Sequence, residues 1–277
     1  SQCRTLSDRG AAVYEYDRHT AAGDECSMFG WRKRIGYIGP TVMEVVPDEF
    51  YKFAPEGIGL VGVTCNIDDW SAEWFDKALA QVAEAGRYLG SRGVDFVLHG
   101  GGPLVVARGE GFDEIIVRDI ERASGVPAST GVRAAMEALR HLGARRIAIA
   151  SPYPERHNRA MADYLAKHGF TIAGAEGMDV PFKRLQAVTP ADIRTFADGV
   201  LRRAKDCDAL YLPCPQWQAS QIVDAMERDT GIPIVAYTHA SFFVAFKALD
   251  ITDPIKGHGR LLASLAAARR GLRSPDS

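Results

Sequence analysis

One cysteine stands where a thiol could take part in chemistry. An apolar run over residues 210–212 ends at Pro213, Cys214 and Pro215, and apolar side chains then recur at helical spacing over residues 218–228. This order predicts a strand, a cysteine-bearing loop and a helix. Ligands of open α/β sheets bind beyond the carboxyl ends of the strands, where a helix amino terminus stabilises anions. Cys214 is therefore the first candidate for catalysis, although a cysteine in a protein is more often a buried, inert small hydrophobe.

A second stretch that could hold a ligand follows the strand predicted over residues 94–98, and it reads His99, Gly100, Gly101, Gly102 and Pro103. Glycine accepts positive φ and leaves its amide unobstructed, so successive glycines can form a concavity that binds an anion. The run lacks the Gly-Lys-Ser/Thr ending of a phosphate loop, and the chain has no Gly-x-Ser-x-Gly elbow of an esterase. His99 is expected to bond to backbone at the strand end, with a role as a second base as the alternative.

The elements that would position these two loops occur twice. Residues 34–60 are paralleled by residues 146–170, and residues 95–139 by residues 208–249. Both copies of the second block run through strand, loop, helix, Gly-Val/Ile-Pro, short strand and helix. A duplication of about a hundred residues predicts two similar units that pack on each other.

We therefore predict an α/β protein with two pseudo-symmetric three-layer lobes, parallel sheets and an active-site cleft between the lobes. Residues 1–34 are expected to be an irregular extension, residues 35–130 with 235–270 to form lobe 1, and residues 131–234 to form lobe 2. Loops at the carboxyl ends of parallel strands would line the cleft, so Cys214 should face the glycine run.

Composition narrows the functional classes. The 277 residues are 47% hydrophobic with a formal net charge of −2, and basic residues are scattered among acids, which disfavours nucleic-acid binding. No apolar run reaches the ~20 residues of a membrane span and no signal peptide is evident, so we expect a cytoplasmic protein. Five cysteines without Cys-x-x-Cys spacing predict reduced thiols and no structural zinc site. The sequence has no metal-ligand clusters and no complete nucleotide loop, so we expect that no metal or organic cofactor is needed. The sequence leaves the oligomeric state open, with a homo-oligomer as one option.

The chain resembles the aspartate/glutamate racemase superfamily, specifically the branch that contains arylmalonate decarboxylase and maleate cis-trans isomerase. The resemblance spans residues 34–262, and it rests on Cys214 after a strand and on the segments 129–158, 231–235 (GIPIV) and 257–262 (GHGRLL). Racemases and isomerases of this type usually carry one cysteine in each lobe. Glycines occupy the first-lobe position here, which matches the decarboxylase pattern.

The resemblance implies a cofactor-independent decarboxylase of a substituted malonate-like dicarboxylate, in which Cys214 protonates one face of an enediolate. The remaining carboxylate is then the electron sink and needs hydrogen-bond donors, whereas the departing one belongs against apolar side chains. Loop hydroxyls found in relatives are replaced here by Gly101, Gly102 and Pro103. The expected substrate-binding residues are Pro40, Thr41, Gly100, Gly101, Gly102, Tyr153 and Pro215, and the expected pocket wall is Leu104, Val105, Val106 and Trp217.

Two other functions stay open. An isomerase or racemase could use His99 or water in place of the first cysteine, and an inactive relative could simply bind a small carboxylate. His239 could approach the cleft but also suits a helix start. Asn158 and Arg260 match family positions without a role that the residues themselves indicate. Trp217 suits lobe packing as well as a pocket wall.

Overall fold

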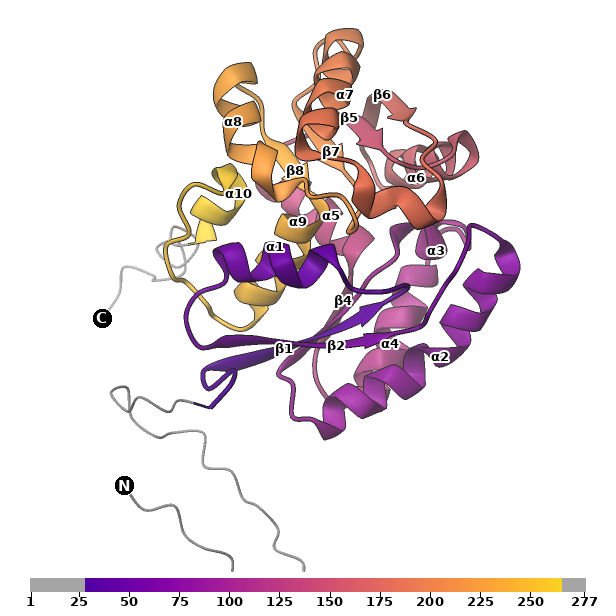
Figure 1. The fold of residues 1–277 in the computed structure, drawn as a ribbon, viewed down its shortest axis with the longest axis vertical. Coiled ribbons are helices and arrows are strands. Elements are labelled where there is room, and N and C mark those ends of the chain that lie inside the picture. The colour runs from indigo at the N-terminus through magenta and orange to yellow at the C-terminus, as the bar shows by residue number, and fades with distance from the viewer. Residues whose placement is uncertain (1–27, 266–277) are drawn as a thin grey trace, which may run out of the picture.

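Two parallel sheets form the framework of the protein, which a computed structural model describes over residues 28–265 (Figure 1). The first is a four-stranded sheet with the order β2-β1-β3-β4. All its neighbouring strands pair in parallel. Its strands are β1 (Lys33–Gly39), β2 (Ile58–Thr64), β3 (Phe96–His99) and β4 (Ala128–Thr130).

The second sheet repeats this arrangement with the order β6-β5-β7-β8, again with parallel pairing throughout. Its strands are β5 (Arg146–Ser151), β6 (Thr171–Gly177), β7 (Ala209–Leu212) and β8 (Ile234–Ala236). The central strands β3 and β7 are buried along their whole length, as expected for parallel strands covered on both faces. The equal strand orders confirm the predicted fold of two pseudo-symmetric α/β lobes.

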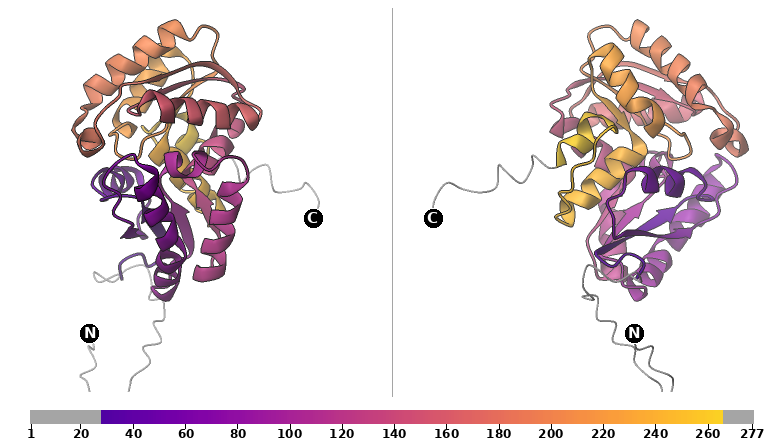
Figure 2. Two further views of the ribbon diagram at one scale, coloured as in Figure 1. Left: turned by 90° about the vertical axis from the view of Figure 1, so that its right-hand side faces the viewer. Right: turned by 60° about the vertical axis from the view of Figure 1, so that its left-hand side comes forward.

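Helices cover both sheets, and Figure 2 shows from two sides that the lobes are stacked on each other. The first half of the chain contributes α1 (Val45–Phe53), α2 (Ala72–Ser91), α3 (Gly102–Val106), α4 (Phe112–Ser124) and α5 (Gly131–His141). The second half contributes α6 (Glu155–Lys167), the 3-10 helix η1 (Phe182–Ala187), α7 (Pro190–Arg203), α8 (Ser220–Thr230), α9 (Tyr237–Ala248) and α10 (Gly259–Ala263).

Helix α9 joins the two lobes. It follows β8 of the second sheet and packs against α1, α5 and β3. The lobe boundaries expected from the sequence, 35–130 with 235–270 and 131–234, stay predictions. Strand β8 spans the residue at which the chain was expected to pass from lobe 2 back to lobe 1, and it pairs with β7. Most of the expected N-terminal extension, residues 1–27, lies outside the described residues, and β1 begins inside the rest of it at Lys33.

A buried carboxylate adds a polar tie between helices. Asp113 of α4 accepts hydrogen bonds from Arg133 Nε of α5 at 3.0 Å and from Tyr164 Oη of α6 at 2.9 Å. A buried charge is tolerated when its hydrogen bonds are satisfied, as they are here. In the described part of the chain, none of the helices combines the length and apolar character needed to cross a membrane.

Candidate active site

A small cavity between the two lobes contains the Cys214 thiol. Its volume is about 30 Å³, which is room for about one water molecule. The first lobe contributes Pro40, Thr41, Ile67, Trp70, Phe75, Gly101, Pro103 and Leu104 to the lining, and the second contributes Tyr153, Phe182, Leu185, Cys214, Pro215 and Gln216. The lining is almost entirely apolar, so a charged group placed there would be poorly solvated.

The cavity gathers most of the residues singled out in the sequence but not all of them. Gly100 and Gly102 are buried on either side of Gly101 without lining the space. Val105 and Val106 follow Leu104 on α3 but belong to the first hydrophobic core, because successive helical residues point about 100° apart. Three expected wall residues therefore lie outside the lining: Val105, Val106 and Trp217, which packs in the core of the second lobe.

Cys214 is held as a buried thiol at the carboxyl end of β7. Its side chain is 2% exposed, and burial raises its pKa from 9.0 to about 12. The backbone amides of Gln216 and Trp217 and the hydroxyl of Tyr153 act in the opposite direction, because they stabilise a thiolate. Cys214 is thus a neutral thiol near neutral pH, which suits a proton donor rather than a nucleophile.

Tyr153 is fixed by a chain of hydrogen bonds. Its Oη donates to the carbonyl oxygen of Pro213 at 2.7 Å, and its amide donates to Ser151 Oγ at 3.1 Å. Ser151 Oγ in turn donates to Asn158 Oδ1 at 3.0 Å. This gives Asn158, whose role was not legible in the sequence, a position behind the tyrosine. The chain holds the Tyr153 hydroxyl beside the Cys214 loop.

The glycine run owes its composition to close packing. Gly101 has a φ of 81°, which is the left-handed region that favours glycine, and it precedes α3 as its N-cap. A Cβ on Gly100 would lie 2.6 Å from the hydroxyl oxygen of Tyr37. The run therefore brings backbone, without any side chain, to the wall of the cavity that belongs to the first lobe.

The two histidines singled out in the sequence, His99 and His239, are buried and neutral. His99 ends β3, does not line the cavity, and has its pKa lowered to about 4 by burial. His239 lies in the first turn of α9, packs against Phe53 and His258, and has its pKa lowered to about 3 by burial. Arg260 makes a structural contact, since its amide donates to Glu227 Oε2 at 2.7 Å.

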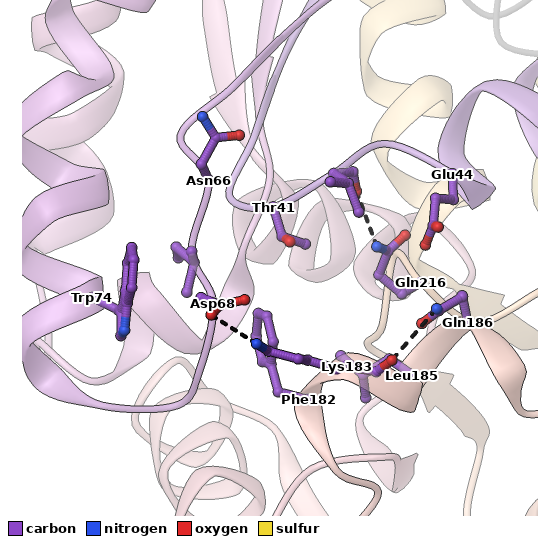
Figure 3. A pocket seen from close by; sticks show the side chains of 12 residues that line it. Thr41, Glu44, Asn66, Asp68, Trp74, Phe182, Lys183, Leu185, Gln186 and Gln216 are labelled. Atoms are coloured by element: carbon purple, nitrogen blue, oxygen red, sulfur yellow. Dashed lines mark hydrogen bonds and ion pairs between the residues drawn. The ribbon is translucent and has the colours of Figure 1, made fainter.

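An outer hollow of about 330 Å³ leads to the cavity, with which it shares Thr41, Ile67, Phe182, Leu185 and Gln216 (Figure 3). Both lobes meet across this entrance. Lys183 Nζ of η1 pairs with Asp68 Oδ2 of the loop after β2 at 2.8 Å, and Gln216 Nε2 donates to the carbonyl oxygen of Val42 at 3.0 Å. The rings of Trp70 and Phe182 meet edge to face with centroids 4.8 Å apart.

Sequence reasoning missed the residues that follow the edge strands. Ile67, Trp70 and Phe75 come after β2, and Phe182 and Leu185 come after β6. The duplication carried a signal for them, because β2 and β6 are equivalent strands whose carboxyl ends face the same cleft. Within residues 28–265, no three His, Cys, Asp or Glu side chains gather closely enough to hold a metal ion.

Comparisons with known proteins identify relatives of this chain. Arylmalonate decarboxylase from Bordetella bronchiseptica is 28% identical over 237 residues, which cover 82% of this chain and 95% of that protein. A maleate isomerase from Pseudomonas putida is 27% identical over 165 residues, covering 57% of this chain and 66% of that protein.

Solved structures lead to the same two groups. A glycine-to-cysteine variant of arylmalonate decarboxylase, with sulfate, superposes with a TM-score of 0.75 and 25% identity over 83% of this chain and 99% of that one. A maleate isomerase from Pseudomonas putida S16, with maleate, superposes with a TM-score of 0.79 and 18% identity over 83% of this chain and 97% of that one. The family model described as arylmalonate decarboxylase matches residues 35–262, and this chain belongs to that family.

Proposed function

We propose that this protein is a cofactor-independent decarboxylase of a substituted malonate-like dicarboxylate. One observation carries the proposal: among the side chains that line the cavity, only Cys214 and Tyr153 are titratable acids, and both belong to the second lobe. Proton transfer at two faces of a substrate carbon needs two such groups on opposite walls. Decarboxylation followed by protonation needs one.

The chemistry follows from the residues around the thiol. The bond between the α-carbon and one carboxylate breaks, carbon dioxide leaves, and the electron pair passes into the remaining carboxylate to form an enediolate. The Cys214 thiol then gives its proton to the α-carbon and becomes a thiolate. The amides of Gln216 and Trp217 stabilise that thiolate, the Tyr153 hydroxyl adds to this when its proton turns from the Pro213 carbonyl to the sulfur, and a proton from solvent restores the thiol.

The apolar lining favours cleavage of the bond to the carboxylate that it surrounds. A carboxylate held against Leu104 and Ile67 loses hydration, whereas carbon dioxide is neutral and loses little, so the lining favours its departure. The aromatic rings of Trp70, Phe75 and Phe182 suit an apolar or aryl substituent on the α-carbon. A cavity of about 30 Å³ is smaller than such a dicarboxylate, so the entrance widens when substrate binds.

The proposal is tested by carbon dioxide release from aryl- and alkylmalonates, with the Cys214→Ser variant as the control. We expect release by the wild type, a chiral product with one deuterium at the α-carbon in deuterated buffer, and loss of activity in the variant. Conversion of maleate to fumarate, or exchange of an α-proton without carbon dioxide release, would replace the decarboxylase with an isomerase. Thermal stabilisation by dicarboxylates without any turnover would indicate a carboxylate-binding protein.

A further inference from the structure

Glu49 of α1 is a buried acid that reaches from the first lobe to the cysteine loop of the second. Its side chain is 0% exposed, and its Oε1 accepts a hydrogen bond from the Ser220 amide at 2.8 Å. Ser220 is the first residue of α8, and Ala219, the residue at the N-cap, has no side-chain acceptor. Glu49 therefore supplies from another lobe the cap that α8 lacks in its own sequence.

The packing around Glu49 offers its charge little compensation. Its second carboxylate oxygen makes no hydrogen bond with any described residue. The hydroxyls of Thr238 and Ser220 face the carboxyl group, and Lys52 acts on it from one turn along α1, although the Lys52 ammonium is exposed and paired with Asp48. A buried carboxylate with so few partners is costly, and a carboxylate that serves only as a cap is usually exposed at a helix end.

Glu49 also acts on Cys214. Its negative charge raises the pKa of the Cys214 thiol, in addition to the larger effect of burial. Four other titratable side chains face the thiol, and burial raises the pKa of each, so they stay neutral: Tyr37, Tyr153, Tyr211 and Tyr237. Among the described residues, Glu49 is thus the charged group that acts on this thiol.

We propose that Glu49 is a positioning residue for Cys214: its carboxylate caps α8, fixes the loop that carries the cysteine, and keeps that cysteine protonated by opposing the positive potential of the helix end. A helix amino terminus otherwise stabilises a thiolate, which is the wrong state for a proton donor. The catalytic part of this inference rests on the proposed decarboxylation, but the protonation of Cys214 can be measured without turnover.

A negative charge on Glu49 favours the protonated form of Cys214 both before and after proton transfer to the substrate. Burial raises the pKa of the Glu49 carboxyl, and the hydrogen bond from the Ser220 amide acts in the opposite direction by stabilising the carboxylate. Before proton transfer, Glu49 keeps the thiol intact. After transfer, a thiolate beside a carboxylate is less stable, which favours the uptake of a new proton.

The test compares the rate at which iodoacetamide alkylates Cys214 in the full chain at one mildly alkaline pH, followed by mass spectrometry of the peptide that contains it. Glu49→Gln keeps the size and the acceptor for Ser220 but removes the charge. A single nearby charge shifts a pKa by about one unit, which is a tenfold change in thiolate. We therefore expect about tenfold faster alkylation in Glu49→Gln, and a rate within about twofold of wild type in Asp48→Asn, an exposed neighbour on the same helix.

A folded Glu49→Gln protein that is alkylated at the wild-type rate would overturn the proposal. If that variant does not fold, Glu49→Asp and Glu49→Asn give the same comparison of charge at equal size, and equal rates in that pair would also overturn it. The uncharged variants could be alkylated faster in a protein that releases no carbon dioxide from any malonate. That result would support the role of Glu49 in keeping Cys214 protonated and would refute the proposed function. If carbon dioxide release by Glu49→Gln is lost at a less alkaline pH than release by the wild type, the role of Glu49 and the proposed function would both be supported.

Discussion

The loops that follow the equivalent strands β3 and β7 differ in what they bring to the cavity. After β3 the chain passes through Gly101 in the left-handed region into the short helix α3 and presents backbone and the apolar side chains of Pro103 and Leu104. After β7 it passes through Cys214, between two prolines, and turns into α8. The lobes thus share a fold but bring different groups to the cavity, since one supplies an apolar wall and the other a thiol.

The same asymmetry recurs where each lobe starts its next helix. Gly131 begins α5 after β4, and Tyr237 begins α9 after β8. A Cβ on Gly131 would lie 2.3 Å from the hydroxyl oxygen of Tyr237, and that hydroxyl is 3.3 Å from the hydroxyl of Tyr37 beside Gly100. Gly100 and Gly131 therefore leave space that the buried rings of Tyr37 and Tyr237 fill.

The largest effect is expected from the thiol itself. Cys214→Ser should lower kcat for decarboxylation by about 10²–10⁴-fold, the contribution of a positioned general acid, because a hydroxyl is far less acidic than a thiol. Steady-state rates of carbon dioxide release measure this, with Cys207→Ser, a half-buried thiol before β7, as the control. A loss below about tenfold in Cys214→Ser would contradict the proposed role of Cys214 as the proton donor.

A second cysteine on the first-lobe wall should give the cavity a proton-transfer group on each side. Gly101→Cys places a thiol on the cavity wall opposite Cys214, and it should increase racemisation of the chiral product by about a hundredfold. The φ of 81° and a Cβ 2.9 Å from the end of Leu104 should also lower the stability of this variant. Loss of optical activity measures the racemisation. Gly100→Cys is the matched control, because its Cβ would meet the Tyr37 hydroxyl and its thiol would not line the cavity. Equal racemisation in both variants, or in wild type, would argue against the one-donor geometry.

Gly131→Ala tests the space that Tyr237 fills. A methyl group 2.3 Å from that ring forces buried residues apart, so the free energy of unfolding should fall by about 1–3 kcal/mol. Chemical denaturation measures the change. Gly199→Ala, in the middle of α7, meets only the flexible end of Arg203 and should instead raise stability by about 0.5–1 kcal/mol through helix propensity. If Gly131→Ala left the free energy of unfolding unchanged, the Tyr237 ring would not be fixed beside residue 131.

Tyr153→Phe should lower kcat about tenfold, a typical value for one charge-assisted hydrogen bond. Because the Tyr153 hydroxyl lowers the pKa of Cys214, its loss should also slow alkylation of the thiol, opposite in sign to Glu49→Gln. Tyr164→Phe is the control, since it removes a comparable hydrogen bond to Asp113 away from the cavity. Faster alkylation in Tyr153→Phe would show that the hydroxyl does not face the thiol as described.

Much of this architecture was legible in the sequence because both the fold and the Cys214 loop repeat a pattern. The direction of side chains was not legible: Leu104, Val105 and Val106 are equally apolar, but only Leu104 lines the cavity, because successive residues of α3 point about 100° apart. Glu49 gave no signal, because an acid on an amphipathic helix is normally exposed. Its burial depends on a contact between lobes that no local pattern encodes.

The smallest effect is expected where the lobes are most alike, at the segments after β2 and β6 that meet over the entrance. Lys183 and Asp68 pair there, but their side chains are 69% and 56% exposed, and an exposed ion pair contributes under about 0.5 kcal/mol. Lys183→Met should therefore change stability by less than that amount and kcat/KM by less than about threefold.

Phe182→Ala removes the ring that packs on Trp70 and should raise KM more than Lys183→Met does, because it opens an apolar wall to water. Both are measured by denaturation and steady-state kinetics; a larger effect on KM in Lys183→Met than in Phe182→Ala would mean that charge, rather than apolar packing, closes the cleft.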